Sequence, residues 1–442
     1  MKLLKLAFIG LSVLIFSVPM QAQSIEKIEL SLDQALELVN DKGMDVLIAQ
    51  QTKAGAKAML SQGNAVFLPQ ISIEETGVKT NDPIGVFGIK LRQGIINASD
   101  FNPAVMNSPD ALHSFTTKVE VRQPIFNADG FYARASAKHQ YSSANEQLKA
   151  TKEHVKLKVK ELYYQLAILD KQVVVQQDYL ETNKAYQNQA NNYYEQGLIS
   201  KSEFLGVQVE VLNAEQALLD AQNNRDTTND ALSLLLGLEG EKFIEVIDKL
   251  EPANVTDISV SPNSKGNAAV VAIEHQLKAS SAMLKSAKVS FLPSLNAFGS
   301  YELHDTKVFG NKSDNYTIGA TLRWDLFKGY KQAGAVAQRK AELRKTELVY
   351  QNSLNKYQAD VRNTRRSIKL ALHSIELSKL KTEQADEDAR MRADRYAQGI
   401  EKTTDLLAAE TSKLASQLGH LQAQYQYFVS IAQLEYLLET EL

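Results

Sequence analysis

Hydrophobic residues recur with two different periods along the chain, and the longer period predicts coiled-coil helices. Alternating steps of four and three separate Val155, Val159, Leu162, Leu166, Leu169 and Val173. Heptad spacing also links Leu205, Val209, Leu212 and Leu219, and further on Leu407, Leu414, Leu418, Leu421, Tyr425 and Phe428. A patchier set comprises Leu354, Tyr357, Val361, Ile368 and Ile375. Sustained spacing of this kind is typical of helices that pack as coiled coils.

The distribution of helix-breaking residues allows these helices to be very long. Residues 125–251 and 294–442 contain no proline, and residues 131–236 contain only two glycines, Gly197 and Gly206. Proline and glycine are the residues that most strongly disfavour a helix interior. A helix over residues 131–195 would be about 100 Å long at 1.5 Å per residue, far longer than a compact globular domain requires.

The shorter period predicts four β-strands arranged as two pairs. Apolar and polar residues alternate over 115–122 and 316–326, and two weaker alternating segments, 70–78 and 294–303, begin directly after prolines. Such alternation is typical of strands with one apolar and one polar face. Each segment is close to the roughly 9–11 residues that a tilted strand needs to cross a bilayer. A half-buried sheet in a soluble protein gives the same alternation and is the alternative.

The two strand pairs belong to two copies of one sequence pattern. Phe67-Leu68-Pro69 recurs as Phe291-Leu292-Pro293, and Tyr194-Glu195-Gln196-Gly197 recurs as Tyr396-Ala397-Gln398-Gly399. The offset falls from 224 to 202 residues between these motifs, because the loop between the strands is longer in the first copy. An internal duplication explains this order.

Composition and charge exclude several classes of protein. The 442 residues carry 49 Lys+Arg against 52 Asp+Glu and no Cys, which excludes a basic nucleic-acid-binding surface, disulfides and thiolate chemistry. Lys2 and Lys5 precede an apolar run over residues 6–18, which Ala22 follows closely. This pattern predicts a secretory signal peptide over residues 1–22, with an uncleaved anchor helix as the alternative.

Two copies supply four strands per chain, too few to close a barrel. A barrel in lipid must close, because open strand edges leave backbone groups unsatisfied, so we expect the chain to oligomerise. The polar faces of the strands carry Lys118, Glu120, Arg122, Arg323 and Asp325. These charges indicate a water-filled lumen, which favours three chains over two because an eight-stranded barrel is filled by its own side chains.

The order of several motifs resembles the TolC family of outer-membrane efflux proteins over essentially the whole chain after residue 22. The motifs are FLP before each strand pair, QPIF and WDLF at the strand ends, the turns YEQGLISKSEFL and YAQGIEKTTDLL, and the loop NDPIGVFGIKLRQGIINASDFNP. The resemblance implies an α+β membrane protein of the bacterial outer membrane. Its homotrimer would form a twelve-stranded β-barrel in outer-membrane lipid above a periplasmic α-helical tunnel. It also implies docking to a periplasmic adaptor (membrane fusion protein) and an inner-membrane pump.

The chain then divides into seven segments. They are a signal peptide (1–22), an N-terminal helix (23–66), an outer-membrane strand pair with an extracellular loop (67–126), a helical hairpin with its tip near 197 (127–236), an equatorial region with the helix that opens the second copy (237–290), a second strand pair (291–327) and a second hairpin with its tip near 399 (328–442). Loops 79–114 and 304–315 are expected to face the exterior.

Gly197 and Gly399 lie where the helical hairpins reverse, and glycine tolerates the left-handed conformation that ends a helix. The resemblance implies adaptor docking at these tips, with apolar contacts from Leu198, Leu205, Ile400 and Leu406.

The resemblance also implies a gate at these tips, with Ser202, Glu203 and Tyr396 at bonding positions and Asp405 in an aspartate ring. Glu401 stands where the family has an arginine, and Ala408 where it has a second aspartate. A reversed Lys201–Glu401 pair is one hypothesis, and simple solvated charges are the alternative.

Six aromatic residues cluster where strands give way to helices: Phe126, Phe131, Tyr132, Trp324, Phe327 and Tyr330. An aromatic belt at the periplasmic membrane interface predicts such a cluster in both copies. Ordinary core packing is the alternative.

Catalytic and metal-binding motifs are absent from the sequence. The seven histidines (113, 139, 154, 275, 304, 373 and 420) form no pair at metal-ligand spacing, and no phosphate loop, nucleophile elbow or HExxH occurs. We therefore expect no enzyme activity, cofactor or bound metal. The expected function is the passive outer-membrane channel of a tripartite efflux system for small molecules or metal ions. The alternatives are an exit duct for type I protein secretion and a soluble periplasmic coiled-coil scaffold or adaptor.

Overall fold

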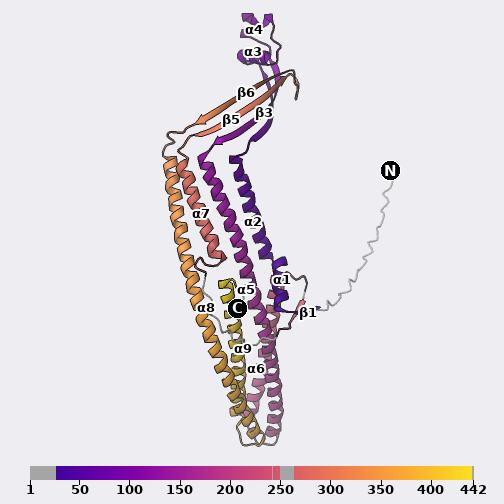
Figure 1. Cartoon of the computed structure of the whole chain (residues 1–442). Coiled ribbons are helices and arrows are strands. Elements are labelled where there is room, and N and C mark those ends of the chain that lie inside the picture. Colours follow the sequence, from indigo (N-terminus) through magenta and orange to yellow (C-terminus); the bar gives the residue numbers. More distant parts are fainter. Residues whose placement is uncertain (1–25, 241, 249–262, 441–442) are drawn as a thin grey trace, which may run out of the picture.

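The computed structural model describes residues 26–240, 242–248 and 263–440, and it is an elongated molecule with a small sheet at one end of long helices (Figure 1). The predicted signal peptide and residues 249–262 of the predicted equatorial region lie outside the described residues. The predicted architecture, an internally duplicated α+β fold with long helical hairpins, is confirmed.

Two helical hairpins form the body of the molecule. The first joins α5 (Ala128–Glu195) to α6 (Lys201–Leu236), and the second joins α8 (Lys331–Ala397) to α9 (Thr403–Leu438). Helices α2 (Met44–Gln62) and α7 (Ala268–Val289) pack beside the upper parts of α5 and α8 (Figure 1). Among the described helices, none combines the length and the apolar character needed to cross a membrane.

The heptad residues of α5 pack within the chain, whereas those of α6 do not. Val155, Val159 and Leu166 of the α5 set are buried. On α6 the predicted set, Leu205, Val209, Leu212 and Leu219, is instead exposed. The residues that pack within the chain form another stripe, which includes Val207, Val211, Ala214 and Leu218. Helix α6 therefore carries two apolar stripes, and its own chain covers one of them.

Four antiparallel strands form the sheet above the helices. They are β2 (Gln70–Thr80), β3 (Leu112–Phe126), β5 (Ser294–Asp305) and β6 (Ser313–Arg323), in the order β2-β3-β5-β6. The two copies meet where β3 pairs with β5. Strand β6 ends earlier than predicted, so Trp324 and Leu326 lie outside it.

The prediction of a single helix over residues 23–66 is wrong. Its described part contains β1 (Glu26–Leu30), α1 (Leu32–Lys42), α2 and a 3-10 turn (Gly63–Val66). Strand β1 pairs in parallel with β4 (Lys242–Val246), a partner more than two hundred residues away in sequence. The Tyr163 hydroxyl of α5 holds this junction by donating to the Leu30 carbonyl at 2.9 Å and to Asp248 at 2.6 Å.

The long loop of the first copy is folded rather than irregular. It contains α3 (Pro83–Arg92), a 3-10 turn η2 (Ala98–Phe101) and α4 (Pro103–Asn107), which together stand above the strands (Figure 1). We call residues 81–111 the cap. The corresponding loop of the second copy, between β5 and β6, is short.

Candidate functional site

One face of the four-stranded sheet is apolar and uncovered by the described chain. The strand register aligns two rows across the sheet: Ile71, Val121, Gly299 and Ile318, and next to it Ile73, Val119, Tyr301 and Tyr316. Ile71, Ile73, Tyr316 and Ile318 are all exposed. An exposed apolar face of this extent indicates contact with lipid or with another protein.

The opposite face of the sheet carries charged side chains that pair with one another. The Lys118 ammonium lies 2.8 Å from Glu120 and 4.0 Å from Glu302, and Arg122 forms a further ion pair with Glu120. The register places Glu74 and Asn315 in the same row as Lys118 and Glu302. This face is therefore suited to water, as the alternation in the sequence predicts.

Both edges of the sheet are open. Among the described strands, β2 pairs only with β3 and β6 pairs only with β5. Each edge therefore presents a row of backbone N–H and C=O groups that can pair with a strand of another chain.

The six predicted interface aromatics gather at the strand-to-helix junctions and are exposed, from 37% for Phe131 to 80% for Tyr330. Trp324 donates its indole N–H to the Phe291 carbonyl at 3.1 Å, and the rings of Phe327 and Tyr330 meet edge to face at 5.6 Å. Since these side chains are exposed, packing into the core of their own chain does not explain the cluster.

Helix α8, like α6, carries an apolar stripe that its own chain leaves exposed. It includes Leu370, Leu377, Leu380 and Met391, all of them exposed. The steps of seven and three between the leucines are those of a coiled-coil seam. The helical body therefore has two seams that its own chain leaves unpaired.

The helical hairpins reverse at the predicted glycines. Gly197 has φ of 75° and Gly399 has φ of 74°, so the predicted left-handed turn is confirmed at both tips. Leu198, Leu205 and Ile400 are exposed there, as a docking contact requires. Leu406 is fully buried at 0% exposure, so the described chain does not present it to a partner.

Two predicted gate residues already have partners within their own chain. Tyr396 is buried at 2% exposure, and its hydroxyl oxygen accepts a hydrogen bond from Thr403 at 3.4 Å. Glu401 pairs with the Arg392 and Arg395 guanidinium groups at 3.2 and 3.0 Å. The hypothesised Lys201–Glu401 pair is therefore not formed within the described part of the chain.

Of the other gate candidates, one is hydrogen-bonded within its own chain and three are exposed. Glu203 completes a capping box at the start of α6, where it accepts the Ser200 backbone N–H and hydroxyl, both at 2.8 Å. These hydrogen bonds lower the pKa of the Glu203 carboxyl below its usual value of 4.5. Lys201, Ser202 and Asp405 are exposed.

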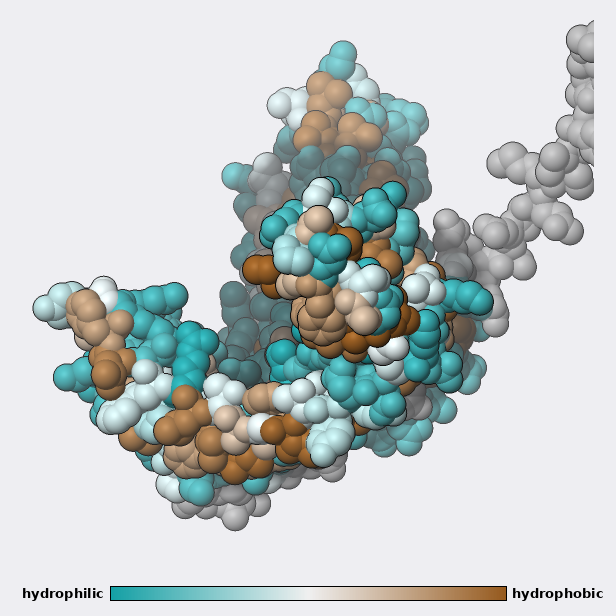
Figure 2. Space-filling view, turned by 90° about the horizontal axis from the view of Figure 1, so that it is seen from above, coloured by the Kyte–Doolittle hydropathy of each residue, from teal (hydrophilic) through white to brown (hydrophobic). Residues whose placement is uncertain are grey.

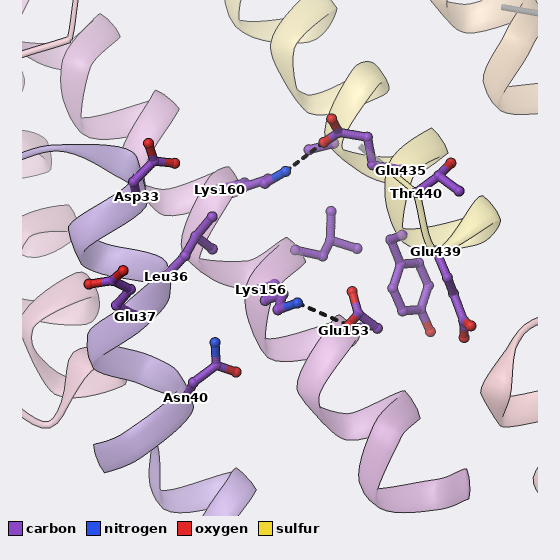
Figure 3. Close-up of a pocket in the computed structure, with 13 residues that line it drawn as sticks. Asp33, Leu36, Glu37, Asn40, Glu153, Lys156, Lys160, Glu435, Glu439 and Thr440 are labelled. Carbon is purple, nitrogen blue, oxygen red and sulfur yellow. Dashed lines mark hydrogen bonds and ion pairs between the residues drawn. The ribbon is translucent and has the colours of Figure 1, made fainter. Parts of the chain in front are cut away.

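A pocket of about 440 Å³ lies at mid-height between α1, α5 and α9. Figure 3 shows its charged lining, in which Lys156 pairs with Glu153 at 3.0 Å and Lys160 with Glu435 at 2.6 Å. Asp33 and Glu37 of α1 line the opposite wall and leave the pocket with an excess of carboxylates.

The fold brings together two histidines that sequence spacing does not connect. The rings of His139 on α5 and His275 on α7 stack with centroids 6.1 Å apart. Desolvation by burial, with His275 and nearby lysines, lowers the pKa of His139. Within the described ranges, no group of three His, Asp or Glu side chains is placed to hold a metal ion.

The family model of the outer membrane efflux protein matches residues 35–238 and 264–439, one segment in each copy. The chain belongs to the outer membrane efflux protein family. This is a family of efflux proteins and not one of enzymes.

Individual relatives agree with this assignment. The chain is 27% identical to the cation efflux system protein CusC of Escherichia coli K12 over 199 residues, which cover 44% of this chain and 38% of that protein. The match therefore spans well under half the length of this curated relative. Across the fold, the crystal structure of the Campylobacter jejuni CmeC outer membrane channel superposes with a TM-score of 0.82 at 15% identity, covering 92% of this chain and 85% of that chain. The outer membrane protein VceC of Vibrio cholerae gives 0.77 at 17% identity, covering 93% and 96%.

Proposed function

We propose that the chain is the outer-membrane exit duct of a tripartite efflux system, a passive channel that conducts small molecules or metal ions to the exterior. The observation that carries the proposal is the sheet, with an exposed apolar face, a charged face and two open edges. A water-filled barrel in lipid needs all three features in each of its segments.

The open edges support closure of the barrel between copies. The β6 edge of one copy pairs with the β2 edge of the next, and three copies supply twelve strands around a lumen lined by Lys118, Glu120 and Glu302. The same ring brings the apolar stripe of α6 against that of α8 in the neighbouring copy. Two different surfaces that meet around a closed ring form a heterologous interface, which suits a cyclic trimer.

The exposed aromatics support a position for the barrel in the membrane. Trp324, Phe327 and Tyr330 form, with Phe126, Phe131 and Tyr132, the belt at the periplasmic interface of the outer membrane. The helices then extend into the periplasm, and their tips carry Leu198, Leu205 and Ile400 to a periplasmic adaptor. The adaptor connects the duct to an inner-membrane pump, which supplies the energy.

The candidate cargo is inferred from the name of a relative and from an acidic residue at the helical tip. CusC is named as a cation efflux protein, and cations are accordingly one candidate cargo. The duct itself performs no chemistry and holds no cofactor. Asp405 is exposed at the tip, and three copies of it at a constriction would favour cations.

The test is single-channel recording of the purified protein in a planar bilayer. We expect discrete, stable conductance steps, and we expect Ile73→Asp on the apolar face to abolish insertion. Ser72→Asp, the adjacent position on the polar face, is the matched control and should still insert. Failure of the unmodified protein to insert, together with solubility in the absence of detergent, would support a periplasmic scaffold instead.

A further inference from the structure

The cap (residues 81–111) is a built element with its own internal bonds. Asp82 caps α3 by accepting the Gly85 N–H at 2.6 Å, and the Lys90 ammonium lies 2.6 Å from the buried Asp100 carboxylate. The rings of Phe87 and Phe101 meet edge to face at 5.7 Å. An ion pair and an aromatic contact between α3 and η2 give the cap a fixed shape.

Side-chain alternation shows which face of the sheet the cap contacts. Gln93, at the end of α3, is buried and donates to the Ser114 hydroxyl at 3.0 Å, and the Ser313 hydroxyl donates to the Arg92 carbonyl. Ser114 and Ser313 lie in register with the charged face that holds Lys118. The cap therefore contacts the sheet at its outer rim on the polar face, which is the lumen side of the proposed barrel.

The short loop of the second copy lies on the other face. The backbone N–H of Phe309 donates to the Glu75 carboxylate at 3.2 Å, and Glu75 shares its face with Ile71 and Ile73. The two copies thus direct their outer loops to opposite sides of one sheet, and only the longer loop reaches the lumen side.

The dimensions allow the cap to reach the centre of the barrel. Twelve strands spaced by about 4.8 Å and tilted by about 40° give a barrel with a backbone radius of about 12 Å. Helix α3, with 10 residues, is about 15 Å long. One cap from each of three copies is large enough to cover the mouth together.

The cap also exposes apolar side chains at the outer end of the molecule. Ile84 is 85% exposed, and Phe101, Val105 and Met106 are exposed as well. Viewed from above, hydrophobic side chains gather on the cap nearest the viewer (Figure 2). Apolar groups on a rigid element over a wet lumen need a partner surface, and the same surface of the other copies lies within reach.

We propose that the three caps of the trimer meet over the outer mouth of the duct through these apolar side chains and form an extracellular gate. The inference rests on the proposed function, because it requires a trimeric pore. It assigns the extra length of the first loop to closing the exit from outside, a role separate from the periplasmic tips.

Cross-linking tests the contact directly, since the chain has no native cysteine. Ile84→Cys in the assembled protein should form an intermolecular disulfide on mild oxidation. Val308→Cys, an exposed position on the short loop, is the matched control and should not cross-link. Absence of cross-linked chains for Ile84→Cys in intact trimers would overturn the proposal.

Conductance separates the gate from the duct. Replacing residues 83–109 by a four-residue Gly-Ser turn should raise conductance or open probability several-fold. Ile84→Asp places three like charges at the contact and should act in the same direction without disturbing the core, whereas Val308→Asp should have no effect. Unchanged conductance in both cap variants, with the wild-type protein forming pores, would overturn the gate alone. Absence of wild-type pores would overturn the proposed function and the gate together.

Discussion

The two copies of the duplicated unit share a frame but differ where polar side chains and loops have diverged. Both contain a strand pair followed by a long hairpin, and both hairpins turn at a left-handed glycine. The first copy adds the cap and clamps its second helix to strand β4 through Arg225 and Asn229. The second copy has a short loop, while each copy has an apolar cluster, around Tyr163 in the first and around Tyr357 and Phe428 in the second. Repeated apolar periods therefore preserve the architecture, while single polar residues give each copy contacts of its own.

The tips show the same division. Glu203 and Asp405 occupy corresponding positions in the two tip motifs. Glu203 is used in a capping box, whereas Asp405 is exposed and Lys402, the N-cap of α9, forms no side-chain cap. The carboxylate of the first tip thus caps a helix, whereas the carboxylate of the second tip is exposed.

The largest effect is expected for the clamp that joins α6 to β4 in the first copy. Arg225 is buried, donates to Asp170 at 2.9 Å and to the Ile244 carbonyl at 2.7 Å, and stacks over Phe243. Arg225→Leu should destabilise the β4 junction by about 2–3 kcal/mol, because it leaves Asp170 and the carbonyl unpaired. Hydrogen exchange of the β4 amides should then be at least tenfold faster. Arg344→Leu, which removes an exposed helix-surface pair, is the control and should leave these amides unchanged.

The next effect should be equal in both copies. Gly197→Ala and Gly399→Ala each force a left-handed backbone on a residue with a Cβ and should lower the free energy of unfolding by about 1 kcal/mol. Gly206→Ala, inside α6 with open space around it, should instead stabilise the helix by roughly 0.5–1 kcal/mol. Thermal melts of the three variants measure this, and unequal losses at the two tips would show that one turn is held by other contacts.

Corresponding carboxylates of the two tips should give different phenotypes. Glu203→Gln should weaken the α6 cap by about 0.5–1 kcal/mol and leave ion selectivity unchanged. Asp405→Asn should leave stability unchanged and reduce cation selectivity or cation block. Reversal potentials in a salt gradient measure the ion selectivity of each variant, and thermal melts measure its stability. Equal selectivity of Asp405→Asn and wild type would contradict an ion-binding role for Asp405.

The smallest effect concerns pH at the first tip. Because Ser200 holds the pKa of Glu203 below 4.5, the ionised cap stabilises the folded state above that value. This contribution is lost as the pH falls from about 4.5 through the lower folded-state pKa. Glu203→Gln should flatten the acid side of the stability profile. A wild-type and Glu203→Gln pair with parallel profiles between pH 6 and 3 would argue against the linkage.

The sequence predicted the elements that repeat and missed those that depend on pairing. Heptads and alternation identify α5 and the four strands, because each period follows from one element's geometry. Strand β1 was missed because its partner β4 is distant in sequence. The hydrophobic repeat also does not show which of the two apolar stripes of α6 packs within the same chain. The cap helices had a local signal, Asp82-Pro83 and Asn102-Pro103, each a helix-capping residue followed by proline at the first helical position.

The central claim is that one face of the sheet meets lipid and the other meets water. The most direct test is thiol labelling of single-cysteine variants at neighbouring positions of β6 in the membrane-inserted protein. Thr317→Cys on the polar face should react with a charged, water-soluble reagent, whereas Ile318→Cys on the apolar face should react only with a lipid-soluble one. Equal reaction of both cysteines with the charged reagent would contradict the account.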